Sequence, residues 1–242
     1  MQVKKITIDC AGFSLDGEFY LPEKERFPVV VFCHALGGQA SNFHITASSF
    51  AREGIGALLF NFRGGGAFDQ SGFPVSQMTL FTEKEDLYAV FNYVKSQPFV
   101  DKIFLFGASQ GGMVAAMVAE ELQTEIAGMI LLYPGFCIAD HLRREFQSVP
   151  KTFELFGLTL GQDYVLSMRS FDTFREVGKF PGPILIFHGD ADHLVPIEYS
   201  KRAEKHYPNA SLVVFENEKH GFTANGNARA AELSLAFLKK IL

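Results

Sequence analysis

Cysteine is scarce in this sequence and tryptophan is absent: the chain has three cysteines, Cys10, Cys33 and Cys137. They form no Cys-x-x-Cys pair, so neither a disulfide framework nor a thiolate zinc site is indicated, and we expect small buried side chains. No segment approaches the roughly 18 apolar residues of a membrane helix, and the N-terminal stretch lacks the apolar core of a secretory signal. We therefore expect no membrane association and a cytoplasmic location.

A basic excess is also lacking. The 22 Lys and Arg residues stand against 27 Asp and Glu residues, which gives a formal net charge of −5. Nucleic acids and anionic membranes both require a basic face, so we expect neither as a partner.

Hydrophobic residues are plentiful, at 48% of 242 residues, which predicts one globular α/β domain over residues 1–242. Phenylalanine alone accounts for 26 residues. A pocket in such a protein is expected to be rich in phenylalanine and to favour apolar or aromatic ligands.

Short apolar runs alternate with stretches of helical spacing along most of the chain. After a predicted antiparallel hairpin (3–10 and 17–21), the expected strands are 29–33, 56–62, 102–107, 128–133, 184–189 and 211–216. The expected helices are 41–53, 80–97, 110–123, 197–207 and 227–242. Strands that are apolar throughout and alternate with helices predict a mostly parallel sheet covered by helices on both faces.

One interval, about 134–180, breaks this alternation. An ordinary crossover needs only a dozen or more residues, so this one carries extra material. We expect a lid laid over the end of the sheet. The alternative is a surface embellishment without ligand contacts.

The stretch Gly107-Ala108-Ser109-Gln110-Gly111 matches the pattern Gly-x-Ser-x-Gly between a predicted strand and a predicted helix. A sharp strand-to-helix turn exposes a serine as a nucleophile, and it needs glycines because the backbone segments approach closely. The helix N-terminus also favours negative charge beside the serine. Alternatively, the serine merely caps the helix.

Acidic residues follow a later predicted strand in "HGDADHLVP" (188–196). Asp192 stands where the acid of a catalytic triad comes in chain order, and Asp190 competes with it. Either aspartate could instead cap a turn or a helix. A metal site built from His188, Asp190, Asp192 and His193 is disfavoured, because four loop residues so close in sequence rarely converge on one ion.

The last predicted strand is followed by "ENEKHGF" (216–222), in which His220 supplies an imidazole. The chain order Ser109, Asp192, His220 is the order that this sheet topology uses for nucleophile, acid and base. A loop histidine without such partners would simply be solvated.

Acyl transfer also needs two backbone N–H groups aimed at the developing oxyanion. We expect one from Gln110, directly after the serine. We expect the other from the loop "CHALGG" (33–38), most plausibly from Leu36 with Ala35 as the runner-up. The glycine pair of that loop could alternatively be a plain turn before a helix.

In their order and separations, "CHALGG", "GASQGG", "HGDADHLVP" and "KHGF" resemble the α/β-hydrolase family over nearly the whole chain. The resemblance implies a sheet of about eight strands with an inserted lid. It makes Ser109 the nucleophile, His220 the general base and Asp192 its orienting acid, with the N–H groups of Leu36 and Gln110 as the oxyanion hole.

Within that family, "TEKEDLYAVFNYVKSQ", the Gly-x-Ser-Gln-Gly elbow and a lid of this length resemble bacterial feruloyl or cinnamoyl esterases. Lid residues of that subgroup bind the phenolic hydroxyl groups of the substrate, and the match implies Tyr164, Asp140 and Gln147 for this role. These three could equally be exposed polar residues. His34 of the oxyanion loop is a further candidate for substrate binding.

Two departures from the family pattern concern the shape of the pocket. Ala35 stands where the family commonly has glycine after the histidine, and "RGGGAFDQSG" (63–72) is unusually rich in glycine. The expected activity is that of a serine carboxylesterase that works through an acyl-enzyme without metal or cofactor, on small esters such as hydroxycinnamates. The alternatives are a short-chain acyl esterase, a lysophospholipase or a small peptidase on the same fold, or a binding module without the chemistry.

Overall fold

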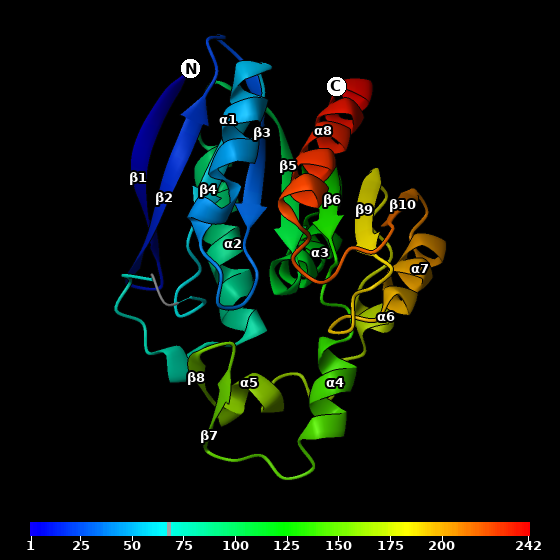
Figure 1. The fold of residues 1–242 in the computed structure, drawn as a ribbon. Coiled ribbons are helices and arrows are strands. Elements are labelled where there is room, and N and C mark those ends of the chain that lie inside the picture. Colours follow the sequence, from blue (N-terminus) through cyan, green and yellow to red (C-terminus); the bar gives the residue numbers. More distant parts are fainter. Residues whose placement is uncertain (67–68) are drawn as a thin grey trace.

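The computed structural model describes residues 1–66 and 69–242, and an eight-stranded sheet forms its centre (Figure 1). The strand order is β1-β2-β4-β3-β5-β6-β9-β10. Their bounds are β1 Gln2–Cys10, β2 Phe13–Leu21, β3 Phe27–Cys33, β4 Gly56–Phe60, β5 Val100–Ala108, β6 Gly128–Leu132, β9 Ile184–Gly189 and β10 Ala210–Phe215. β1 and β2 pair antiparallel, as do β2 and β4, and the remaining pairs are parallel. The predicted α/β fold with a mostly parallel sheet is confirmed.

Both faces of the central strands are buried, which explains their unbroken apolar sequences. Every residue of β4 and of β6 is buried. On one face the rings of Phe32 and Phe106, from adjacent strands, lie 4.6 Å apart, and Phe43 packs on Phe106 at 5.4 Å. The many phenylalanines of this chain therefore largely build the core.

Two helix layers cover the sheet (Figure 1). Helices α2 (Leu80–Lys95) and α3 (Gln110–Leu122) pack on one face, and α1 (His44–Arg52) and α8 (Ala224–Ile241) pack on the other. Helix α7 (Ile197–His206) lies beside β9 and β10. Short 3-10 turns, η1 Ala40–Phe43, η2 Val75–Gln77 and η3 Gln123–Glu125, complete the connections.

The connecting segment 134–180 lies beyond the carboxyl ends of the parallel strands (Figure 1). It holds α4 (Ile138–Glu145), the hairpin β7 (Thr152–Leu155) and β8 (Leu158–Gly161), α5 (Gln162–Leu166) and α6 (Thr173–Glu176). At its end, the carboxylate of Glu120 on α3 accepts N–H bonds from Gly178, Lys179 and Phe180. At the hairpin, Gly161 packs so closely on Ser76 of η2 that a Cβ would lie 2.0 Å from the Ser76 carbonyl oxygen.

No helix in the two described ranges is both long and apolar enough to cross a membrane.

Candidate active site

Ser109 stands at a sharp turn between β5 and α3, with φ +52° and ψ −119°. A non-glycine residue rarely adopts such a positive φ, and holding it there costs on the order of 1–3 kcal/mol. Main-chain bonds enforce it: the Ser109 N–H donates to the Leu132 carbonyl at 2.9 Å, and the Ser109 carbonyl accepts from Gly135 N–H at 2.7 Å. The turn has the backbone geometry of a nucleophile elbow.

Two glycines make this turn possible. A Cβ on Gly107 would lie 2.5 Å from the Gly111 carbonyl oxygen, and a Cβ on Gly111 would lie 2.4 Å from the carbonyl oxygens of Cys33 and His34. Helix α3 therefore begins in direct backbone contact with the end of β3. The spacing of glycines around the serine follows from this close approach.

The structure brings Ser109, His220 and Asp192 together from three separate loops. The His220 Nε2 atom lies 2.9 Å from the Ser109 hydroxyl oxygen, and its Nδ1 atom lies 2.8 Å from Asp192 Oδ2. The ring of Tyr133 packs 4.6 Å from the imidazole, measured between centroids. In this arrangement Nδ1 carries the proton donated to Asp192, which leaves Nε2 free to accept from serine.

The Asp192 carboxylate is fully buried and well supplied with donors. Its Oδ1 accepts N–H bonds from Leu194 and Val195, both at 2.9 Å. Burial raises the pKa of this carboxyl, but hydrogen bonds from His188 and His220 and from the Val195 N–H outweigh burial and hold the pKa well below its usual range. Asp192 is therefore ionised and favours a positive charge on His220.

Asp190, the competing acid, is placed elsewhere. Its Oδ1 accepts the N–H of Asn217 at 2.6 Å, and it is exposed. His188 is buried, with ring nitrogens 2.6 Å from the Ser200 hydroxyl and 2.9 Å from the Val195 carbonyl. Within the described ranges, no cluster of three or more His, Cys, Asp or Glu side chains is arranged to hold a metal ion.

The backbone of Leu36 and of Gln110 lies at the cavity beside Ser109. The Gln110 N–H is the first of α3, and the first N–H groups of a helix have no partner within it. In the facing loop, Gly38 N–H donates to the Ala35 carbonyl and Gly37 N–H donates to the Gly65 carbonyl, both at 2.8 Å. Leu36 and Gln110 line the same cavity as Ser109, whereas Ala35 does not.

His34 supports this loop from inside the protein. Its Nδ1 donates to the Ala35 carbonyl at 2.8 Å, and its Nε2 accepts the Phe62 N–H at 3.1 Å. Burial lowers the pKa of His34 to about 4, so the ring is neutral. The structure does not bring His34 to the cavity at Ser109, and both of its ring nitrogens are occupied by the backbone.

The glycine-rich loop after β4 braces the oxyanion loop through the Gly65 carbonyl. Asp69 Oδ2 accepts the N–H of Gly64 at 2.8 Å and so closes this turn. Residues 67 and 68 of the expected loop 63–72 lie outside the described residues.

A cavity of about 90 Å³ adjoins Ser109. Its walls are mostly apolar and come from the oxyanion loop, α4, the β7–β8 hairpin and the loop before α7: Leu36, Ile138, Leu142, Leu155, Phe156 and Val195. Segment 134–180 thus supplies most of the wall that faces the serine.

Of the three candidate phenol-binding residues, one lines this cavity. Tyr164 is 2% exposed, and its hydroxyl donates to Gln110 Oε1 at 2.6 Å. Asp140 instead accepts the Tyr199 hydroxyl at 2.6 Å and pairs with Arg143. Gln147 is exposed after the end of α4. Among the described residues, neither Asp140 nor Gln147 belongs to the cavity wall.

Sequence reasoning missed two polar residues of this site. His141 lines the cavity, and its place three residues after Ile138 along α4 was a usable signal, because this spacing puts two side chains on one helix face. Glu83 of α2 is 1% exposed, and its Oε2 accepts from Gln110 Nε2 at 2.9 Å. Its position three residues after Leu80 and four before Leu87 places it on the apolar stripe of α2.

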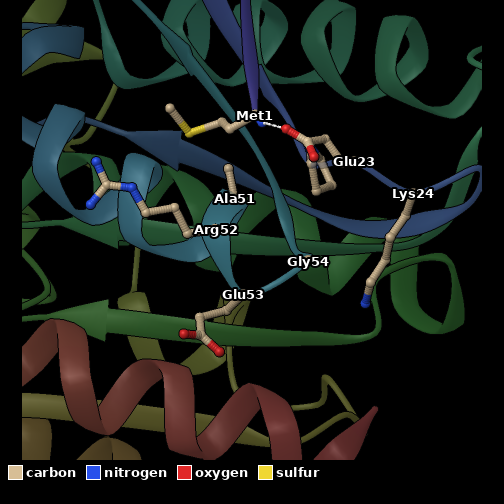
Figure 2. A pocket seen from close by; sticks show the side chains of 8 residues that line it. Met1, Glu23, Lys24, Ala51, Arg52, Glu53 and Gly54 are labelled. Atoms are coloured by element: carbon tan, nitrogen blue, oxygen red, sulfur yellow. Dashed lines mark hydrogen bonds and ion pairs between the residues drawn. The ribbon is translucent and has the colours of Figure 1, made fainter.

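A second hollow, of about 390 Å³, lies before the amino ends of β3 and β4. Figure 2 shows the side chains that line it. The hollow is bordered by Met1, where the terminal amine pairs with Glu23, and by Lys24, Arg52 and Glu53. These side chains offer charge of both signs but no nucleophile paired with a base. The contact between Ser109, His220 and Asp192 lies at the other end, at the carboxyl ends of the parallel strands.

Comparison with known proteins agrees with this geometry. The family described as "Serine aminopeptidase, S33" matches residues 24–165, which is more than half of the chain. The chain belongs to the S33 family of α/β hydrolases. Its fold and family are those of serine hydrolases. A further match, to "TAP-like protein", covers residues 168–240.

The S33 chain is similar to solved structures over its whole length. It matches Est1E from Butyrivibrio proteoclasticus with ferulic acid bound at 26% identity and a TM-score of 0.89, covering 98% of this chain and 99% of that one. The same protein in another structure gives 25% identity, 98% coverage of both chains and a TM-score of 0.87. The expected resemblance to α/β hydrolases is confirmed.

Curated relatives are matched only in part. Human ABHD12B is 26% identical over 212 residues, 82% of this chain and 56% of that protein. The peptidase YtmA of Bacillus subtilis is 28% identical over 138 residues, 51% of this chain and 48% of that protein. The chain thus spans between about half and 58% of the length of the curated relatives that it matches.

Proposed function

We propose that this protein is a serine carboxylesterase that works through an acyl-enzyme. The observation that carries the proposal is the continuous contact from Asp192 through His220 to Ser109, at 2.8 Å and 2.9 Å, on a strained elbow at the carboxyl end of the sheet. A serine hydroxyl is a weak nucleophile until a base and an orienting acid are both in reach.

In the first half of the reaction, the Ser109 oxygen attacks the ester carbonyl while His220 Nε2 takes the hydroxyl proton. The ionised Asp192 holds the Nδ1–H tautomer and favours the imidazolium that forms. The N–H groups of Gln110 and Leu36 stabilise the oxyanion. His220 then protonates the leaving alcohol, and a water molecule repeats the sequence on the acyl-enzyme.

Segment 134–180 acts as a lid within a single domain, residues 1–242. The support is its place beyond the carboxyl ends of the strands and its large share of the cavity wall. Ligands of open α/β sheets bind at this edge, so material laid over it decides what reaches the serine.

The acyl group that we propose is a hydroxycinnamate. The support is the apolar cavity wall, the likeness to Est1E, which binds ferulic acid, and polar atoms at the cavity. The Tyr164 hydroxyl donates its hydrogen bond to Gln110, and its oxygen can still accept a hydrogen bond from a substrate phenol. His141 is the second polar partner.

A short-chain acyl esterase is the second candidate, and the cavity volume favours it. About 90 Å³ is small beside the roughly 300–1,000 Å³ of typical ligand pockets. An acetyl or butyryl group is closer in size to this cavity than a hydroxycinnamate is.

The test compares methyl ferulate and methyl p-coumarate with acetyl, butyryl and longer acyl esters and with short peptides. We expect the highest kcat/KM for the aromatic esters. A higher kcat/KM for butyryl esters would replace the aromatic assignment with the second candidate. Ser109→Ala should abolish turnover by about 10⁶-fold and prevent labelling by a fluorophosphonate probe while leaving the thermal unfolding curve unchanged. Activity retained in that variant would refute the serine mechanism.

A further inference from the structure

The acidic stretch T-E-K-E-D at the start of α2, residues 82–86, buries two of its three carboxyl groups. Asp86 faces a cation, because its Oδ1 lies 2.8 Å from Nε of the buried Arg63. Glu83 faces no cation among the described residues. Its one hydrogen-bond partner there is the side-chain amide of Gln110.

A carboxyl group in this position is costly. Glu83 lies on the apolar stripe of α2 with Leu80 and Leu87, and a buried acid without a paired cation is destabilising relative to an apolar side chain of similar size. Burial raises the pKa of Glu83 to about 8, so the group is kept mostly protonated at neutral pH. Packing alone does not account for an acid here.

The contact with Gln110 accounts for an acid at this position, because Glu83 holds one end of the Gln110 amide. The Gln110 amide is held at both ends, because Nε2 donates to Glu83 at 2.9 Å and Oε1 accepts from the Tyr164 hydroxyl at 2.6 Å. Both polar ends of the amide are thereby occupied, one by α2 and the other by the lid. The side chain of the residue that follows the nucleophile is thereby fixed between α2 and the lid.

We propose that Glu83 is a positioning residue that, through the Gln110 side chain, holds the Gln110 N–H in the oxyanion hole and connects it to Tyr164 of the lid. The inference rests on the proposed function. Oxyanion donors act only when they are aimed at the charge that develops, so a small displacement of this N–H raises the barrier to reaction. The bound substrate has no oxyanion before the reaction begins, so its binding does not depend on the direction of this N–H. A change at Glu83 should therefore leave KM nearly unchanged.

The experiment uses the full chain with Glu83→Leu, Glu83→Gln and a stability control, Thr79→Ala. Thr79 caps α2 by accepting the Thr82 N–H at 3.1 Å and touches neither Gln110 nor Tyr164 through a hydrogen bond. Three quantities are measured: kcat and KM on the best ester, the inhibition constant of a boronic acid that mimics the tetrahedral intermediate, and the rate of fluorophosphonate labelling of Ser109.

We expect Glu83→Leu to lower kcat, boronate affinity and labelling rate by about tenfold to a hundredfold, less than the loss of a whole oxyanion donor, with KM within about threefold. Glu83→Gln keeps an acceptor for Gln110 and should stay within about threefold of the parent in all three. Thr79→Ala should lower the stability of the protein and leave kcat, boronate affinity and labelling rate unchanged. Equal losses in the Leu and Gln variants, or parental kinetics in Glu83→Leu, would overturn the proposal.

If Glu83→Leu does not fold, Gln110→Met and Tyr164→Phe test the same connection. Each should lower the labelling rate, and the double variant should lose no more than Gln110→Met alone, because both changes cut one chain of contacts. Additive losses would refute the connection. Failure of the proposed function is recognised separately, because Ser109→Ala would then retain activity whatever the Glu83 variants do.

Discussion

Two buried carboxyl groups contact the two residues beside Ser109: Asp192 contacts His220, and Glu83 contacts Gln110. The first is ionised and the second is mostly protonated. Asp192 accepts bonds from two backbone N–H groups and from His188 and His220, whereas Glu83 accepts one bond, from Gln110. The pKa of Asp192 lies well below the usual range, and that of Glu83 is raised to about 8. The number of donors, more than burial alone, decides which carboxyl is ionised.

Removing the charge of Asp192 is expected to have the largest effect. Asp192→Asn keeps the size of the side chain, but its amide group favours the wrong imidazole tautomer, so kcat should fall by about 10⁴-fold. Steady-state kinetics on the best ester measures this loss.

Asp190→Asn is the matched control for that change. Asp190 stands two residues earlier in the same loop, and an asparagine oxygen can still accept the Asn217 N–H. We expect kcat within about threefold of the parent. A loss of kcat comparable to that of Asp192→Asn would contradict the assignment of the orienting role to Asp192 alone.

The neutral state of Glu83 predicts how stability depends on pH. Between the ordinary pKa of 4.5 and about 8, the unfolded chain has lost a proton that the folded chain keeps, so rising pH favours unfolding. Relative to Glu83→Gln, the parent should lose up to about 1.4 kcal/mol of unfolding free energy per pH unit across this window and level off above it.

Urea denaturation of both proteins at several pH values measures the difference. The neighbouring groups Asp86, Cys33 and Tyr164 are present in both proteins, so their own titration largely cancels. A difference that stays constant with pH would show that Glu83 is ionised in the folded protein, like Asp192.

The smallest effect is expected at Glu120, a carboxylate that has donors but no contact with the reacting residues. Glu120→Ala removes the acceptor for three N–H groups at the end of the lid segment. The free energy of unfolding should fall by about 1–3 kcal/mol, with kcat/KM for small esters within about threefold. A loss of kcat as large as that of Glu83→Leu would show that the lid end also controls the oxyanion hole.

The sequence predicted most of the sheet because buried parallel strands leave unbroken apolar runs. It also led to Ser109, Asp192 and His220, because residues directly after such runs meet at one edge of the sheet. The helix expected at 41–53 begins at His44, since residues 40–43 form a 3-10 turn before it.

The lid side chains were harder to predict. Their directions depend largely on how α4 and the β7–β8 hairpin pack, and helical spacing indicates only which side chains of α4 share a face. Asp140 turns to Tyr199, 59 residues away in sequence, while His141 next to it faces the cavity. Glu83 was missed because an acidic residue in a charged stretch is typical of a solvated surface, although its spacing from Leu80 and Leu87 places it on the apolar stripe of α2.

The backbone contact of Gly111 with the ends of Cys33 and His34 has a consequence for engineering. It joins the start of α3 to the oxyanion loop through main-chain atoms, and the His34 side chain holds that loop from inside. Grafting a different segment between Gly135 and β9 therefore leaves the reacting groups in register, because the Gly135 N–H that bonds the Ser109 carbonyl is kept. Acyl preference can be redesigned there on an unchanged scaffold, provided that the graft supplies a partner for the Gln110 amide.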